Sequence, residues 1–81
     1  MKVVVNISLK EGVLDPEGQA IKTSLSNLGF KNLNDVRTGK QIILDFEKLE
    51  ENEAVLKAKK MCEDLLVNTV IEKYKIKVLR N

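Results

Sequence analysis

The chain has 81 residues, of which 43% are hydrophobic and 32% are charged, and its formal net charge is +2. This length predicts one domain, residues 1–81, that buries only about 60% of the surface its unfolded form exposes, and the charge is too small to indicate nucleic acid or an anionic membrane as a partner. No apolar run approaches the roughly 20 residues of a membrane span, and one cysteine cannot form an internal disulfide, so we expect a cytoplasmic protein.

The first 29 residues predict a strand followed by a capped helix. Apolar and polar residues alternate over residues 2–10, which is the period of a strand. Asp15 and Pro16 then favour a helix start, because aspartate is a good N-cap and proline suits the first helical position. We expect this helix to reach about Leu28 and to end at Gly29 in the left-handed conformation.

Residues 33–47 predict a β-hairpin that turns at Thr38 and Gly39. Apolar and polar residues alternate on both sides, and a glycine supplies the positive φ that a tight turn needs. The hairpin would bring Asp35, Arg37 and Lys40 together at its tip. These side chains could dock a carboxylate or phosphate, or they could simply flank a turn.

The last third of the chain predicts a helix and a strand. Apolar residues are spaced by three and four over residues 52–67, with Cys62 on the core side and Asn68 ending the helix in the left-handed region. Residues 70–79 alternate as a strand. The resulting order predicts an α+β fold, a ferredoxin-like βαββαβ sandwich with a four-stranded antiparallel sheet of order 4-1-3-2 and both helices on one face.

This fold leaves one sheet face uncovered, with Val4 and Ile43 as central neighbours. They could be tolerated surface residues, but an apolar patch on an open sheet usually meets a partner, so we expect a subunit contact and at least a homodimer. Lys73, Lys75 and Lys77 form a row on the last strand. The row could attract an anionic partner, but we favour the view that it only keeps an edge strand solvated.

Catalytic groups are scarce in this sequence. It has no histidine, which removes the commonest general base and metal ligand and leaves Cys62 without a Cys–His partner. The pair Gly39-Lys40 lacks the upstream glycine of a phosphate-binding loop. We therefore expect this chain to contain no catalytic, cofactor-binding or metal-binding residue.

Three sequence runs closely resemble the PurS subunit family of phosphoribosylformylglycinamidine synthase. They are VLDPEGQA at residues 13–20, DVRTGK at residues 35–40 and MCEDLLVNTVIE at residues 61–72. The resemblance implies a non-catalytic accessory subunit of this ATP- and glutamine-dependent ligase of de novo purine (IMP) biosynthesis. It would join the glutaminase PurQ to the synthetase PurL and help to shield ammonia, while ATP and magnesium are used by the synthetase.

The same resemblance implies that the motif residues are structural and interfacial. The turn at Asp15 and Pro16 and the corner at Asn68 and Thr69 would present backbone groups to partners. An alternative with the same strand and helix order is an ACT-like regulatory domain that binds a small molecule. An RNA-recognition module is disfavoured, because the open face of the predicted sheet lacks the aromatic residues that stack on bases.

Overall fold

A computed structural model describes residues 1–80; Asn81, the last residue of the predicted domain, lies outside the described residues. The elements are β1 (Lys2–Leu9), α1 (Pro16–Asn27), β2 (Gly39–Asp45), α2 (Glu51–Met61), the π-helical turn η1 (Cys62–Leu66) and β3 (Glu72–Leu79). The strands form one antiparallel sheet in the order β2-β1-β3. The predicted α+β class is confirmed. None of the described helices is long and apolar enough to cross a membrane.

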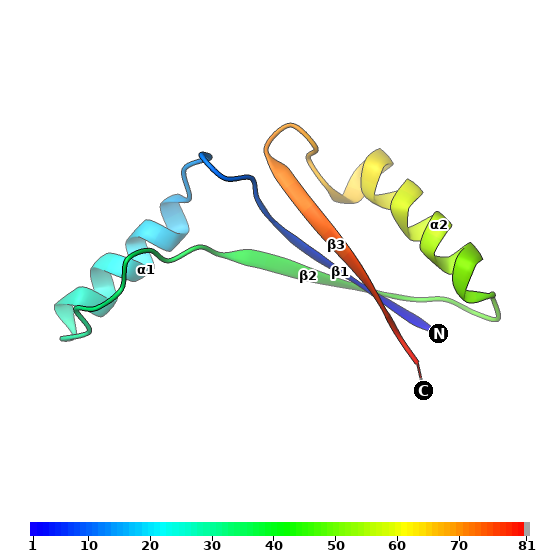
Figure 1. Cartoon of the computed structure of the whole chain (residues 1–81), viewed down its shortest axis with the longest axis horizontal. Coiled ribbons are helices and arrows are strands. Elements are labelled where there is room, and N and C mark those ends of the chain that lie inside the picture. Colours follow the sequence, from blue (N-terminus) through cyan, green and yellow to red (C-terminus); the bar gives the residue numbers. More distant parts are fainter. Residues whose placement is uncertain (81) are drawn as a thin grey trace.

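The core lies between one face of the sheet and α2. Val3, Val5 and Ile7 of β1 point to this face and are at most 2% exposed. Ala54 and Ala58 of α2 are fully buried against it, and their small side chains let the helix approach the sheet closely. The helix packs over β1 and β3 (Figure 1). Apolar alternation in β1 and small residues in α2 therefore determine which sheet face is covered.

The second helix ends in a wider turn than its sequence indicates. The Val67 N–H donates to the Cys62 carbonyl, five residues earlier, at 3.0 Å, which is the spacing of a π turn. This spacing places both residues in the core, so the core position of Cys62 is confirmed. The predicted left-handed end at Asn68 is wrong, because Val67 is already extended and no described residue other than glycine has positive φ.

The predicted hairpin at Thr38 and Gly39 is also wrong. Residues 31–38 contain no strand, and the chain continues from them into β2 without folding back (Figure 1). Gly39 does not have positive φ. Its missing side chain serves a close approach instead, because a Cβ atom there would lie 2.7 Å from the Ile7 carbonyl oxygen. The sheet of this chain consequently has three strands, not the predicted four.

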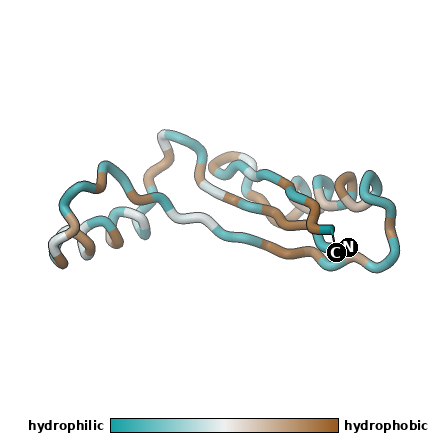
Figure 2. Tube along the Cα trace, turned by 60° about the horizontal axis from the view of Figure 1, so that its bottom comes forward, coloured by the Kyte–Doolittle hydropathy of each residue, from teal (hydrophilic) through white to brown (hydrophobic). Residues whose placement is uncertain are grey.

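Helix α1 lies at one end of the molecule, away from the sheet (Figure 1). The prediction that both helices cover one sheet face is therefore wrong for a single chain. The molecule is elongated, with extents of 49 × 30 × 14 Å. We call residues 10–38, which contain α1 and its flanking segments, the arm. Hydrophobic positions recur through α1 and the segment after it (Figure 2), and Leu28 is 73% exposed.

Both ends of α1 form as the sequence predicts. Asp15 is the N-cap and Pro16 is the first helical residue. At the other end Gly29 has φ +104°, and the Phe30 N–H donates to the Leu25 carbonyl at 3.0 Å. This bond closes the left-handed helix end that favours glycine. The arm therefore contains a well-defined helix even though that helix does not pack on the sheet.

Candidate functional site

The Asp15 side chain joins the two segments of the arm that meet the sheet. It is only 4% exposed. Its Oδ1 atom accepts the Gly18 N–H at 2.8 Å, and its Oδ2 atom accepts the Thr38 N–H at 2.6 Å and the Thr38 hydroxyl at 2.9 Å. These bonds favour the ionised carboxylate, so the Asp15 pKa is lowered, chiefly by the Thr38 amide. One carboxylate therefore caps α1 and holds the segment that leads into β2.

Gly18 brings α1 against that same segment. The residue is buried, and a Cβ atom on it would lie 2.1 Å from the Val36 carbonyl oxygen and 3.0 Å from the Asp15 carboxylate. No other amino acid fits at this distance unless the backbone moves. Together, Asp15, Gly18, Val36 and Thr38 form what we call the clamp.

Arg37 extends the clamp to the loop after β1. Its guanidinium donates to the Val13 carbonyl at 2.7 Å and to the Lys10 carbonyl at 3.3 Å. Arg37 is exposed, but its guanidinium is already hydrogen-bonded within its own chain. Both crossings between arm and sheet, residues 10–15 and residues 35–38, are thus tied to one another by side-chain hydrogen bonds.

The three residues predicted to share a hairpin tip have separate surroundings. Asp35 is exposed and accepts the Val36 N–H at 2.9 Å. It lines a shallow hollow with Arg37 and Lys73, whereas Lys40 lines a different one. The expected cluster is absent because residues 35–38 run on into β2 instead of turning back.

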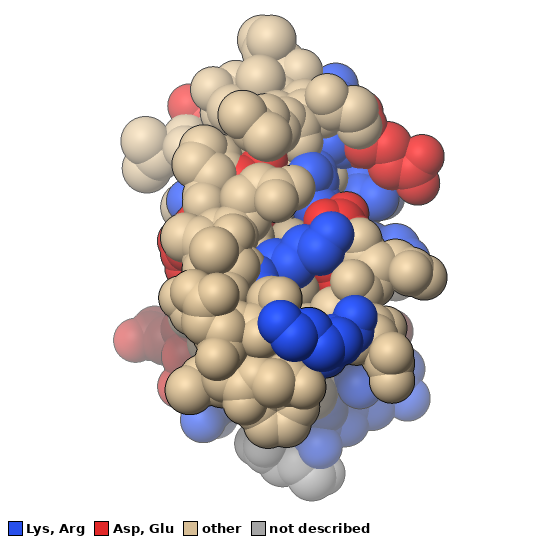
Figure 3. All heavy atoms as spheres, turned by 90° about the vertical axis from the view of Figure 1, so that its left-hand side faces the viewer, with Lys and Arg blue, Asp and Glu red and all other residues tan. Residues whose placement is uncertain are grey.

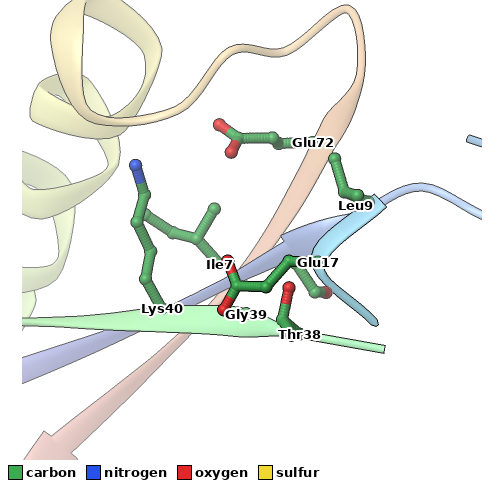
Figure 4. Close-up of a pocket in the computed structure, with 8 residues that line it drawn as sticks. Ile7, Leu9, Glu17, Thr38, Gly39, Lys40 and Glu72 are labelled. Atoms are coloured by element: carbon green, nitrogen blue, oxygen red, sulfur yellow. The ribbon is translucent and has the colours of Figure 1, made fainter. Parts of the chain in front are cut away.

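A hollow of about 250 Å³ lies where the arm meets the sheet. Charged side chains from three elements, Glu17 of α1, Lys40 of β2 and Glu72 of β3, surround it (Figure 4). Ile7 contributes an apolar wall and is paired across the sheet with Lys40 and Tyr74, which places the hollow on the face that α2 covers. Within residues 1–80, no group of three or more histidine, cysteine or acidic residues could hold a metal ion.

The opposite sheet face, which none of the described helices covers, contains the two predicted apolar neighbours. Val4 lies directly between Ile43 of β2 and Lys77 of β3, so the predicted pairing of Val4 and Ile43 is confirmed. Val4 is 5% exposed because its neighbours flank it, whereas Ile43 is 54% exposed. Lys73 and Lys75 lie on the same face as Lys77, at alternate positions of β3. We call this surface the open face.

The corner at Asn68 and Thr69 is exposed but largely bonded within the chain. The Thr69 carbonyl accepts the Lys10 ammonium at 2.7 Å. The Asn68 carbonyl accepts the N–H groups of Ile71 and Glu72 at 3.1 and 2.7 Å, and the Asn68 N–H donates to the Glu72 carboxylate at 2.8 Å. These bonds occupy three of the four backbone N–H and C=O groups of Asn68 and Thr69, and the interface role of this corner stays a prediction.

Two members of the clamp, Gly18 and Thr38, have roles that the sequence reasoning did not find. Glycine is about 1 kcal/mol less favourable than alanine inside a helix. A glycine in the first turn of α1 was therefore a signal of close backbone packing. Thr38 gave no such signal, because its partner Asp15 lies 23 residues earlier.

Comparisons with known proteins agree on one family. A family model described as "PurS: Phosphoribosylformylglycinamidine (FGAM) synthase" matches residues 2–80. The chain is 48% identical over 77 residues to the PurS subunit of this synthase from Bacillus subtilis, covering 95% of this chain and 90% of that protein.

Solved structures with the same fold include two that cover almost all of this chain. PurS from Methanocaldococcus jannaschii is similar with a TM-score of 0.88 and 42% identity, over 99% of this chain and 96% of that one. A chain in the structure of PurLQS from Thermotoga maritima has a TM-score of 0.86 and 33% identity, over 96% of this chain and 95% of that one. The coverage in the first case is nearly the whole chain, so α1 lies within the matched part.

Gly18→Ala tests the clamp against helix propensity. Alanine is the better helix former, so propensity alone predicts a more stable protein. The contact with the Val36 carbonyl predicts the reverse, a loss of about 1–3 kcal/mol from overpacking. Ser24→Ala, at an exposed position of the same helix, is the control and should have little effect. Denaturant unfolding of both variants measures the difference, and a stabilised Gly18→Ala protein would contradict the close contact.

The lowered pKa of Asp15 predicts a pH-dependent contribution to stability. Because the folded pKa lies below the ordinary value of 3.8, the contribution is complete well above pH 3.8 and is lost as the pH falls through the folded pKa. Asp15→Asn should therefore melt at a lower temperature than the parent at neutral pH, with a difference that shrinks in acid. Asp45→Asn, at an exposed position of β2, is the control. A difference that stays constant at every pH would refute this role of the carboxylate.

Proposed function

The chain belongs to the PurS family of phosphoribosylformylglycinamidine synthase subunits, and we propose that it connects the glutaminase PurQ to the synthetase PurL. It is an accessory subunit of a ligase (EC 6.3.5.3) of purine biosynthesis. The observation that carries the connecting role is the presence of a chain of the same fold in the structure of PurLQS from Thermotoga maritima.

We infer that the chain contributes surfaces to this reaction and no reacting group. Its most buried carboxylate, Asp15, accepts three hydrogen bonds within the clamp, and Arg37 is bonded to loop carbonyls. On this proposal the chain is a single cytoplasmic domain that binds no cofactor. PurQ releases ammonia from glutamine, PurL uses ATP and magnesium, and this chain helps to shield the ammonia between them.

We further propose that two copies of the chain exchange their arms. The apolar residues of the arm support this exchange, because Leu28 and Phe30 are 73% and 61% exposed and Ile21 and Leu33 are 37% and 40% exposed. The end of the molecule at α1 presents an uncharged area beside a group of lysine and arginine side chains (Figure 3). A surface of this kind on a small domain is typical of an interface.

The face of the sheet that α2 covers has a partly exposed apolar area to which the arm of a second copy can bind. Helix α2 packs over β1 and β3, so Ile42 and Leu44 of β2 remain only half-buried on that side. In the predicted fold the first helix would cover this region. The α1 helix of a second copy can occupy it, and reciprocal exchange gives a closed dimer with two-fold symmetry.

The exchange also provides the strand that a single chain lacks. β2 is an edge strand with unpaired backbone groups on its outer side. Residues 33–37 of the second copy can pair with it, next to the α1 helix that they follow in the chain. On this proposal the order 4-1-3-2, with two helices on one face, is a property of the dimer.

The double variant Ile21→Asp with Leu28→Asp tests the exchange. A charge buried at an apolar interface loses its hydration, so this variant should sediment as a monomer under conditions where the parent sediments as a dimer. Thr23→Asp, at an exposed position of α1, is the control and should leave the dimer intact. A parent chain that is monomeric at micromolar concentration, or a double variant that still dimerises, would refute the exchange.

Omitting the chain from a reconstituted enzyme tests the connecting role. Alone, the chain should show no glutaminase, ATPase or amidine-forming activity. Without it, the synthetase and glutaminase subunits should lose glutamine-dependent synthesis, whereas synthesis from free ammonium should decline less. Equal losses with glutamine and ammonium would mean that the chain also shapes the synthetase site. Undiminished glutamine-dependent synthesis in its absence would refute the proposal.

A further inference from the structure

We propose that the open face docks an acidic surface of a partner subunit, centred on Ile43 and attracted by the lysines of β3. This inference rests on the proposed function, because it assigns one surface of the connector to a subunit other than a second copy of this chain. Four observations carry it: the cross-strand register, the charge of the face, its apolar centre and the position of the arm.

The register places the lysines in successive rows across the sheet. Lys77 lies beside Val4, which lies beside Ile43. Lys75 and Lys73 head the next two rows, in which the side chains that follow are uncharged: Asn6 and Gln41, then Ser8 and Gly39. In these three rows the open face thus has a basic border along β3 and neutral or apolar side chains on β1 and β2, and the fourth row, Leu79, Lys2 and Asp45, adds one charge of each sign.

The net charge of the open face favours an acidic partner. Its ionisable side chains are Lys2, Lys73, Lys75, Lys77 and Asp45, which gives four positive charges and one negative, a net charge of +3. Within residues 1–80, none of the three lysines of β3 forms a salt bridge. Lys73 shares a hollow with Glu11 and Asp35, so it is the charges of Lys75 and Lys77 that remain available to carboxylates on another molecule.

All three charges in the lysine row of β3 are positive, and this argues against a role limited to keeping an edge strand solvated. A charged side chain of either sign protects an edge strand from pairing with another edge. Mixed signs would do this without the repulsion among three lysines at alternate positions. A row of positive charges is instead complementary to an acidic surface. Such a row also raises the rate of association with that surface.

The centre of the face supplies apolar contact area. Ile43 is 54% exposed and lies on β2 beside Val4, on the side of Val4 opposite Lys77. An exposed apolar residue bordered by charged and polar ones resembles the arrangement of a protein–protein interface, with an apolar centre and a polar rim.

A second copy of the chain is a poor occupant of this face. Two open faces packed together would oppose charges of +3 and +3, and like charges across an interface disfavour association. The proposed dimer also uses the other side of the sheet, where the arm is received. The open face of each copy therefore stays accessible after the dimer has formed.

The test is a titration of this chain into fixed amounts of its synthetase and glutaminase subunits. The concentration that gives half-maximal glutamine-dependent synthesis measures docking, and sedimentation of the chain alone measures self-association. Lys75→Glu with Lys77→Glu should raise the half-maximal concentration about tenfold or more and leave sedimentation unchanged. Lys75→Gln with Lys77→Gln should have a smaller effect, and high salt should weaken the parent more than the charge-reversed variant.

The matched control reverses two charges elsewhere. Lys57→Glu with Lys59→Glu makes the same change in net charge on the exposed side of α2 and should behave like the parent. Thermal melting of each variant verifies its fold. An equal effect of both pairs of substitutions would show that only net charge matters and would overturn the inference.

The remaining outcomes separate this inference from the proposed function. If the parent chain does not restore synthesis at any concentration, the connecting role itself fails. If the parent restores it and the Lys75→Glu with Lys77→Glu variant restores it at the same concentration, only the docking inference fails. Altered sedimentation of that variant would show that the open face meets a second copy, which also overturns the inference.

Discussion

The structure depends on one buried carboxylate. Asp15 accepts the Gly18 amide at the start of α1 and both the amide and the hydroxyl of Thr38 before β2. These bonds join two crossings of the chain that lie 23 residues apart. Because Gly18 lets α1 contact the Val36 carbonyl, the helix and the returning segment behave as one piece. The clamp therefore holds the arm away from the sheet.

The position of the arm determines what each side of the sheet can do. With α1 away, half of the covered face, near Ile42 and Leu44, is left for another helix. The arm in turn exposes apolar residues that one chain cannot bury. Reciprocal exchange satisfies both needs at once, and it leaves the basic open face available to other subunits. On these two proposals, self-association and partner binding use opposite sides of the sheet.

Features governed by neighbouring residues could be predicted from the sequence. The N-cap at Asp15, the left-handed helix end at Gly29 and the alternation of β1 each depend on physical effects within a few residues. The position of Val4 and Ile43 as neighbours on adjacent strands could be predicted from the expected order of the central strands. The hairpin failed because Gly39 suits both a tight turn and a close approach to the Ile7 carbonyl. The choice between them depends on Asp15 and Arg37, whose bonds cross long stretches of sequence.

The failed hairpin and the proposed dimer are two outcomes of one local sequence. If residues 33–47 turned back at Thr38, the strand before the turn would pair with β2 of its own chain, and α1 would cover its own sheet. With Thr38 held by Asp15, the segment runs on into β2, and the same strand and helix can reach only a second copy. Local contacts are alike in both arrangements, so the apolar pattern cannot distinguish them. The difference lies in the clamp, where the bonds of Asp15 to Thr38 and the contact of Gly18 with Val36 hold the segment in its extended course. On the proposed exchange, these contacts are what direct the arm to a second copy.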